Sequence, residues 1–203
     1  FYLSQKYRNP IIVLSDGLLG QMMEPAEFVK YPYPEIDNSD WALTGAKGRA
    51  PRKIRSLEIN EEKHNANVQH LFDKYAQMER EEVLYEEHNV EDADVLLVAF
   101  GTMGRNIKAA MNEGRKQGLK IGTFRPITLF PFPNKRLSEL AEKTKKIIVA
   151  EMNMGQMIKD VKIAVNGKAE VVHLGRPAGE WIDVDETLDA VRKMIGEHHA
   201  TSI

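Results

Sequence analysis

The chain has 203 residues, 42% of them hydrophobic and 29% charged, a composition typical of soluble globular proteins that argues against wholesale disorder. Its 28 Lys and Arg residues against 30 Asp and Glu residues give a net charge of −2, which does not indicate a nucleic-acid or membrane-surface binder. The absence of cysteine excludes, within this chain, a disulfide framework, a thiolate zinc site, a cysteine nucleophile and a cysteine-ligated iron–sulfur cluster.

Residues 1–30 are predicted to hold a helix, a strand and a second short helix. Residues 1–8 have the pattern of the last turns of a helix, which ends at Asn9-Pro10 because proline cannot continue it. The apolar run 11–14 has strand length and is typical of a strand buried on both faces of a parallel sheet. A short helix is expected within 18–28. Because the chain starts without Met and in mid-helix, we expect it to be truncated or processed.

Residues 31–92 are predicted to be a connecting segment with one long helix. Two X-Pro pairs in 31–34 favour extended backbone, and glycines and prolines interrupt any regular element up to about residue 60. Long irregular connections are uncommon in compact domains and are usually functional or interfacial. A helix is then predicted over 61–88, because apolar residues recur there at a spacing of three or four.

Residues 93–203 alternate regularly between strand-length apolar runs and helical patterns. The predicted strands are 95–100, 119–124, 147–150 and 169–174. The predicted helices are 105–117, 134–144, 155–165 and 184–198. Such alternation means βαβ units and a largely parallel sheet. We therefore predict a three-layer α/β/α fold with a mostly parallel sheet, preceded by a partial α/β segment and a long connecting region.

Two of these helices have recognisable start signals. Asn134 follows Pro-Phe-Pro and is predicted as the N-cap of the helix over 134–144. Asp183 and Glu186 have capping-box spacing at the start of the last helix.

The turn after the strand at 95–100 contains Gly101, Thr102 and Gly104 and leads into a helix. Free N–H groups at a helix start favour anions, and glycine lets a ligand or another backbone approach closely. A dinucleotide-binding fingerprint needs a third glycine and an acidic residue ~20 positions later. This chain lacks the third glycine, and Gly122 and Thr123 stand where the acidic residue should be. A tight strand-to-helix turn is therefore favoured, with an interface or anion contact as the alternative.

Two further loops follow predicted strands, at the sheet edge where ligands and partner surfaces gather in open α/β folds. Arg125 opens a Pro- and Phe-rich loop over 125–133, and a structural salt bridge is favoured there over a contact with a ligand carboxylate or phosphate. Glu151, Asn153 and Gln156 place an acid and two amides in a loop that also carries methionines. A helix-capping turn and an interface are equally favoured for this loop, both above catalysis.

Other patterns predict no site. Ser15-Asp16-Gly17 is similar to the Gly-Asp-Gly that opens a thiamine diphosphate and magnesium motif, but Ser15 replaces its first glycine. The nearest candidate for the closing asparagine, Asn38, is isolated in a Pro-rich loop, so a coincidental turn is favoured. The histidines show no metal-ligand spacing with carboxylates, and no Ser-His-Asp or paired-carboxylate arrangement is present. No catalytic residue and no metal site are therefore predicted in this chain.

Four motifs together carry a family resemblance. They are Asp94-Val-Leu-Leu-Val-Ala-Phe-Gly-Thr, Arg125-Pro-Ile-Thr-Leu-Phe-Pro-Phe-Pro, Glu151-Met-Asn-Met-Gly-Gln-Met and Gly175-Arg-Pro-Ala-Gly. Residues 93–196 resemble the transketolase C-terminal domain as it occurs in 2-oxoacid:ferredoxin (acceptor) oxidoreductases. Residues 1–30 resemble the end of the pyrimidine-binding-type domain that precedes it in the alpha subunit. The most similar subtypes are the 2-ketoisovalerate and 2-oxoglutarate enzymes.

The resemblance implies an enzyme that oxidatively decarboxylates a 2-oxoacid on thiamine diphosphate, passes electrons through iron–sulfur clusters to ferredoxin and yields an acyl-CoA. It implies that thiamine diphosphate, magnesium, iron–sulfur clusters and CoA belong to the holoenzyme and that this chain holds none of them. The implied partners are a thiamine-binding beta, a gamma and a ferredoxin-like delta subunit, with ferredoxin reached through the holoenzyme and with self-association as an option. A cytoplasmic location is expected, and neither nucleic acid nor membrane is expected as a partner.

The resemblance carries over no catalytic residue, so the isolated chain is expected to be inactive and to serve subunit assembly and the shaping of the active-site interface. The expected parts are 1–30, the end of the preceding domain; 31–92, the connecting segment; and 93–203, the transketolase C-terminal-like domain. One alternative is a non-catalytic α/β module that binds a nucleotide or anion at 101–105. Another is a relative of the transketolase or dehydrogenase E1 beta group, against which the Pro-Phe-Pro loop argues weakly.

Overall fold

The computed structural model describes residues 1–177 and 180–196 and divides into two compact units. One unit comprises Phe1–Ser15 and Gln21–Gln77, and the other comprises Asp16–Gly20 and Met78–Ile203. The last two residues of the Gly175 motif and the end of the helix predicted to reach residue 198 lie outside the described residues.

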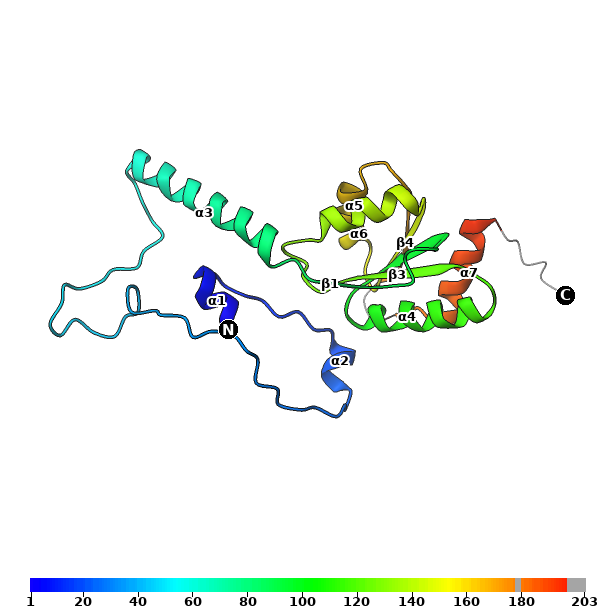
Figure 1. Ribbon diagram of the computed structural model, residues 1–203, viewed down its shortest axis with the longest axis horizontal. Coiled ribbons are helices and arrows are strands. Elements are labelled where there is room, and N and C mark those ends of the chain that lie inside the picture. The colour runs from blue at the N-terminus through cyan, green and yellow to red at the C-terminus, as the bar shows by residue number, and fades with distance from the viewer. Residues whose placement is uncertain (178–179, 197–203) are drawn as a thin grey trace. The chain divides into compact units, whose positions relative to one another are not determined.

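The second unit is built around a β-sheet (Figure 1). The sheet has five strands in the order β1-β3-β2-β4-β5. Its four parallel strands are β2 (Val95–Val98), β3 (Ile121–Pro126), β4 (Lys146–Glu151) and β5 (Glu170–Gly175). The first strand, β1 (Tyr85–His88), pairs antiparallel with β3 at one edge. In the centre, Leu97 lies beside Thr123 on one side and Ile148 on the other. The central strands are buried on both faces, which is why they appear in the sequence as continuous apolar runs.

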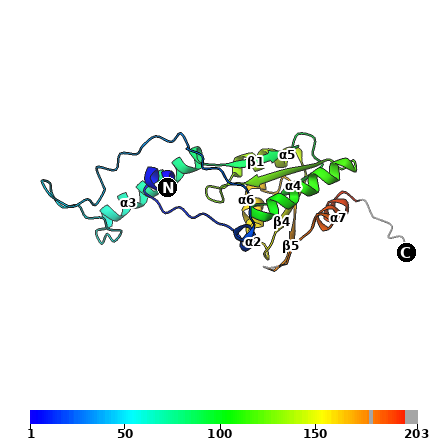
Figure 2. The ribbon, with the colours of Figure 1, turned by 90° about the horizontal axis from the view of Figure 1, so that it is seen from below.

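Helices cover both faces of this sheet (Figure 1 and Figure 2). One face carries α4 (Gly101–Lys116) and α7 (Val184–Ile195), and the other carries α5 (Asn134–Lys143) and α6 (Met157–Val165). Alternate side chains of each strand point to opposite faces, so Leu96 packs with α5 and α6 whereas its neighbour Leu97 packs with α4 and α7. The three-layer, mostly parallel fold predicted from the sequence is confirmed.

The two predicted helix starts had different outcomes. The capping box of α7 is present, because the Glu186 N–H donates to Asp183 Oδ1 at 2.8 Å and the Asp183 N–H donates to Glu186 Oε2 at 3.2 Å. The prediction of Asn134 as the N-cap of α5 is wrong. Asn134 is the first helical residue and Pro133 is the N-cap, without a side-chain hydrogen bond. The fixed φ of Pro133 already directs the chain into the first turn.

Two predicted elements before residue 92 are wrong. The run Ile11–Leu14, predicted to be a buried strand, forms no strand and is exposed. A strand needs a hydrogen-bonding neighbour, and the described residues of its unit contain no other strand. The helix predicted over 61–88 ends earlier, as α3 (Glu61–Glu81), and β1 follows it. Pairing with β3 and stacking of Tyr85 on Phe124, with ring centroids 5.2 Å apart, override the helical pattern there.

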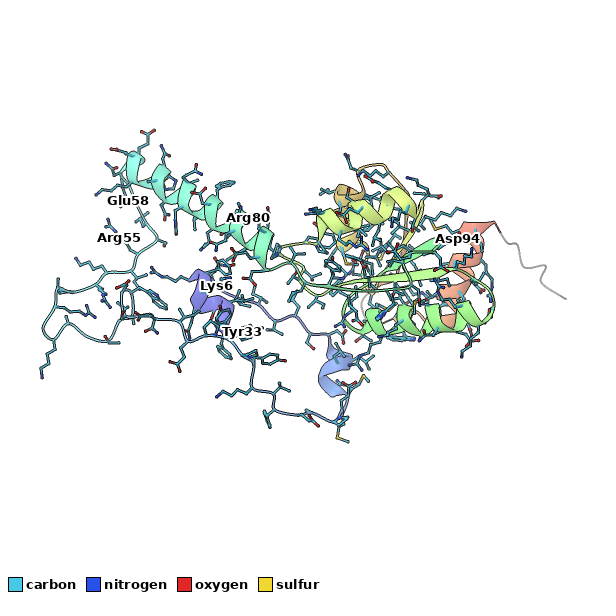
Figure 3. All side chains as sticks on the ribbon, in the orientation of Figure 1. Lys6, Tyr33, Arg55, Glu58, Arg80 and Asp94 are labelled. Atoms are coloured by element: carbon cyan, nitrogen blue, oxygen red, sulfur yellow. The ribbon has the colours of Figure 1, made fainter. Side chains whose placement is uncertain are left out.

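The first unit is mostly irregular. Its helix α1 (Tyr2–Tyr7) ends at Arg8, whose left-handed backbone (φ 46°) precedes Asn9-Pro10, the point at which the sequence predicts the end of a helix. Tyr33 stacks on Tyr2 of α1, with ring centroids 4.5 Å apart (Figure 3). Residues 22–60, all of them described, form no helix or strand.

Within the described ranges, no helix combines the length and the apolar character needed to cross a membrane.

Candidate functional site

The carboxyl ends of the four parallel strands lie at one edge of the sheet, and the loops that leave this edge carry all seven predicted contact residues. We call this region the carboxyl edge and define it as residues 99–105, 125–133, 151–157 and 175–182, excluding 178 and 179. In open α/β sheets this is the edge at which ligands and partners bind.

The N-terminus of α4 is occupied by a carboxylate of the chain itself, that of Asp16. The Thr102 hydroxyl donates to Asp16 Oδ2 at 2.5 Å, and the Thr102 N–H donates to the same oxygen at 3.2 Å. The other oxygen, Oδ1, accepts the N–H of Leu19 at 2.8 Å, in the short helix α2 (Gly17–Gln21). Gly101, predicted to lie in a turn, is the first residue of α4, and a Cβ there would stand 3.4 Å from Asp16 Oδ2. One carboxylate therefore caps two helix starts.

This contact gives a structural role to Asp16 that the sequence does not predict. Asp16 and Thr102 are 86 positions apart, and no local pattern connects them. The region around Gly101 does attract an anion, as its free N–H groups predict, but that anion is internal. A nucleotide or a free anion would have to displace the Asp16 carboxylate to bind there.

Replacing Asp16 should have a pH-dependent effect on stability. Partial burial pushes the pKa of Asp16 upward, but the hydrogen bonds from Leu19 and Thr102 outweigh it and leave the pKa below 3.8, its ordinary value. A carboxyl with a lowered pKa stabilises the fold above its unfolded pKa and loses that contribution as the pH falls through its folded pKa. We expect Asp16→Ala to lower the free energy of unfolding by about 1 kcal/mol at pH 7 and by much less near pH 2.

Urea denaturation at the two pH values checks this expectation. Asp40→Ala is the matched control, because Asp40 is exposed and its side chain forms no hydrogen bond or ion pair within the described part of the chain. A loss of the same size at pH 7 and near pH 2 would contradict the assignment.

Arg125 forms the structural salt bridge favoured by the sequence. Its Nη1 donates to Glu86 Oε2 at 3.1 Å. The other oxygen of Glu86 lies 2.6 Å from His88 Nε2 and 3.2 Å from Lys108 Nζ. Hydrogen bonds from His88, Lys108 and Arg125 lower the pKa of the Glu86 carboxyl to about 2, although its partial burial acts in the opposite direction. A Cβ on Gly104 would lie 3.0 Å from Arg125 Cδ, so the glycine lets the arginine cross α4 closely.

Glu151 is a fully buried carboxylate at the end of β4, and it caps α6. Its Oε2 accepts the N–H groups of Met157 at 2.8 Å and Gln156 at 3.2 Å, and its Oε1 accepts that of Ile158 at 3.0 Å. Asn153 adds a second acceptor, because its Oδ1 also binds the Gln156 N–H, at 3.0 Å. Gln156 contributes its backbone to this arrangement, and its side chain is exposed. The capping turn favoured by the sequence is therefore present.

The end of β5 packs against this cap. His173 Nε2 lies 3.7 Å from Glu151 Oε1 and is a buried atom without a hydrogen-bond partner in the part of the chain that the structure describes. A Cβ on Gly175 would collide with the His173 ring and lie 2.6 Å from the carbonyl oxygen of Asn153. The glycine is needed here because two chain segments meet without room for a side chain.

A buried amide joins α4 to α7, and the sequence gives no signal for it. Asn106 Nδ2 donates to the carbonyl oxygen of Ile182 at 2.8 Å, and the Thr187 hydroxyl donates to Asn106 Oδ1 at 3.0 Å. On the surface nearby, Arg176 forms an ion pair with Glu186. These polar side chains of the carboxyl edge and its neighbours bind one another and hold the loops in place.

Large apolar side chains are exposed at the same edge. Ile127, Phe130, Met154 and Trp181 are each between 44% and 75% exposed. Phe132, by contrast, packs against the core beneath α5 and α6. Exposed apolar side chains that gather at one edge are typical of an interaction surface.

The residues of this chain do not fit the metal-containing cofactors that the resemblance implies for the holoenzyme. An iron–sulfur cluster is held by thiolates, and the chain has no cysteine. In residues 1–177 and 180–196, no group of three His, Asp or Glu side chains is placed to hold a metal ion. The carboxylates of Asp16 and Glu151, which lie at the starts of α4 and α6, already accept hydrogen bonds from backbone N–H groups. No reaction step is therefore assigned to these residues.

Comparisons with known proteins agree on one kind of relative. Residues 93–187 match the family described as pyruvate:ferredoxin oxidoreductase core domain II. The ketoisovalerate oxidoreductase subunit VorB of Methanothermobacter marburgensis is 40% identical over 197 residues, which are 97% of this chain and 56% of that protein. The 2-oxoglutarate synthase subunit KorA of the same organism is 28% identical over an alignment of 222 positions, which covers 96% of this chain and 59% of that protein. The chain thus spans little more than half the length of these relatives.

Among solved structures, the 2-oxoglutarate:ferredoxin oxidoreductase from Magnetococcus marinus has a similar fold. Its TM-score is 0.58 at 20% sequence identity, and the match covers 69% of this chain and 24% of that chain. At this level of identity the likeness shows a shared fold.

Proposed function

The chain is a homologue of the ketoisovalerate oxidoreductase subunit VorB and the 2-oxoglutarate synthase subunit KorA, and from this premise we propose that it is part of the alpha subunit of a thiamine-diphosphate-dependent 2-oxoacid:ferredoxin oxidoreductase. The enzyme converts a 2-oxoacid oxidatively to its acyl-CoA in the cytoplasm. The observation that carries the proposal is 40% identity to VorB over 97% of this chain.

Within that enzyme, the chain serves subunit assembly and the shaping of the active-site interface. Two observations support this role. Thr102 and Glu151 of the carboxyl edge take part in helix capping, and the neighbouring Asn106 joins α4 to the loop before α7. The same edge exposes large apolar side chains, which suit contact with another protein.

The cofactors and partners follow from the same proposal. Thiamine diphosphate, magnesium, the iron–sulfur clusters and CoA are held by other parts of the holoenzyme, which comprises a thiamine-binding beta, a gamma and a ferredoxin-like delta subunit. Ferredoxin takes the electrons. Residues 1–30 are the end of the pyrimidine-binding-type domain, and residues 31–92 are the connecting segment. Residues 93–203 form the transketolase C-terminal-like domain.

A substitution at the carboxyl edge tests the assembly role. Phe130→Asp puts a charge on an exposed apolar side chain that the proposal places in a subunit contact, and we expect the affinity for the companion subunits to fall about tenfold. Ile163→Asp is the matched control, because Ile163 is 73% exposed on α6, outside the carboxyl edge. Analytical size-exclusion chromatography and calorimetric titration of the companion subunits measure both.

Failure of the unmodified chain to bind any companion subunit would contradict the proposed function. Equal affinities for Phe130→Asp and Ile163→Asp would instead show that the carboxyl edge is not the contact surface. A nucleotide-binding module is not favoured as an alternative, because Asp16 fills the N-terminus of α4.

A further inference from the structure

We propose that residues 41–57, here called the basic segment, dock on an acidic protein surface of a partner subunit. The inference rests on the proposed function, since it takes the chain to be a subunit, and it adds a second contact surface and the chemistry of its partner. The basic segment belongs to the first unit, separate from the carboxyl edge in the sequence.

The basic segment concentrates positive charge in a chain that is slightly acidic overall. Its seventeen residues contain no Asp or Glu and have five basic side chains: Lys47, Arg49, Arg52, Lys53 and Arg55. The whole chain has a net charge of −2. Five like charges on a short segment repel one another, and an acidic partner surface would relieve that repulsion.

Little of this charge is neutralised within the chain. Arg55 pairs with Glu58 at 3.1 Å, just outside the segment, and Figure 3 labels both side chains. Arg49 and Arg52 bond to the carbonyl oxygens of Ala50 and Ala42, each at 3.0 Å, so they keep their charge and shape the loop.

The two lysines of the basic segment form no ion pair with any described residue. Lys47 and Lys53 are exposed and have no ion-pair partner in the described part of the chain. Two exposed ammonium groups and two guanidinium groups that only bind carbonyls are thus available to carboxylates of another molecule.

From residue 43 onward, the backbone of the basic segment makes few hydrogen bonds and its large apolar side chains are exposed. Leu43, Ile54 and Leu57 are each between 55% and 71% exposed. Within 43–57, a stretch that the structure describes completely, the Arg49 N–H bound to the Ala46 carbonyl is the one backbone–backbone hydrogen bond. An irregular segment with exposed aliphatic side chains does not stabilise itself, and contact with a partner would bury them.

The apolar side chains favour an acidic protein over a nucleic acid. Phosphate groups would pair with the basic side chains but leave three large aliphatic side chains in water. The segment begins with an aromatic ring, that of Trp41. The guanidinium carbon of Arg8 lies 5.0 Å from the ring centroid and takes one of the two faces on which a base could stack. A protein surface with carboxylates around apolar pockets engages both kinds of side chain.

The match to VorB covers 97% of this chain, so residues 41–57 lie within the matched span.

Charge reversal tests the inference. The full chain with Lys47→Glu and Lys53→Glu is compared with unmodified chain for binding to the separately purified companion subunits, by calorimetric titration at 50 and 300 mM NaCl. The control is Lys159→Glu with Lys162→Glu, which makes the same change of charge at two exposed lysines of α6. At 50 mM NaCl we expect the first variant to bind at least tenfold more weakly and the control to bind like unmodified chain. At 300 mM NaCl the difference in affinity between the Lys47/Lys53 variant and unmodified chain should become smaller, because salt screens the ion pairs with the partner.

The outcomes separate this inference from the proposed function. Unchanged affinity of the Lys47/Lys53 variant at both salt concentrations, with normal binding of unmodified chain, would overturn the inference and leave the proposed function standing. Absence of binding by unmodified chain would overturn both. Tighter binding of unmodified chain to a 20-base-pair DNA duplex than to the companion subunits, lost in the variant, would assign the basic segment to nucleic acid and overturn the inference.

Discussion

Glu151→Ala is expected to lower the free energy of unfolding of the α/β unit by about 3 kcal/mol. The substitution removes a helix cap and also leaves buried N–H donors without an acceptor. The Glu151 carboxylate is fully buried and accepts three backbone N–H groups at the start of α6. Alanine leaves the donors of Met157 and Ile158 without an acceptor, and both residues are buried.

Two further variants isolate the cause of this loss. Glu151→Gln keeps an acceptor oxygen but removes the charge, so it should lose about half as much stability. Glu170→Ala, at an exposed position of β5, should be close to neutral. Urea denaturation at pH 7 measures all three, and a loss below about 1 kcal/mol for Glu151→Ala would refute the capping role.

Gly175→Ala is expected to cost about 2 kcal/mol or more, as overpacking against a rigid neighbour does. A Cβ at this position meets the His173 ring and lies 2.6 Å from the carbonyl oxygen of Asn153. The ring can rotate away, but the carbonyl belongs to the loop that caps α6, so the loop itself must shift. We therefore expect the substitution to disturb the loop at the carboxyl edge as well as to lower the free energy of unfolding.

Gly20→Ala is the matched control for this substitution. A Cβ on Gly20 has no atom within 4 Å, and the position is helical, so alanine should be neutral or slightly stabilising. Thermal and urea unfolding compare the two variants. Equal stability of Gly175→Ala and Gly20→Ala would show that the junction of β5 with the α6 cap is looser than the structure indicates.

Hydrophobic periodicity correctly predicted the elements whose burial can be read from their own stretch of sequence. The runs that became β2 and β4 are buried on both faces, and the capping box at Asp183 and Glu186 lies within four residues of sequence. Such signals need no knowledge of the rest of the chain. The same is true of the Glu151 loop, whose acceptor and donors lie within seven positions of one another.

The errors arise where the deciding partner is distant in the sequence. Ile11–Leu14 has the composition of a strand but no strand beside it in its own unit. Tyr85–His88 follows a helical pattern but pairs with β3, about 40 positions away. Composition and spacing describe what a segment can form, and the available neighbour decides what it does form.

The candidate site shows the same division. The sequence pointed to Arg125 and to a salt bridge, but only the fold identifies Glu86 as its partner. Asp16 stands 86 positions before Thr102, and Asn106 stands 81 positions before Thr187. Neither pair has a sequence signature, because any Asp or Asn in a loop or helix would look the same.

The central claim is that this chain is a scaffold that serves other subunits and does not carry out the reaction itself. The most direct test is a steady-state assay of CoA-dependent 2-oxoacid oxidation, with a viologen dye as electron acceptor. The chain alone, the companion subunits alone and the assembled complex are assayed in parallel. We predict no turnover by the chain alone and turnover by the complex when it also contains the rest of the alpha subunit. Thiamine-diphosphate-dependent turnover by the purified chain alone would contradict the claim.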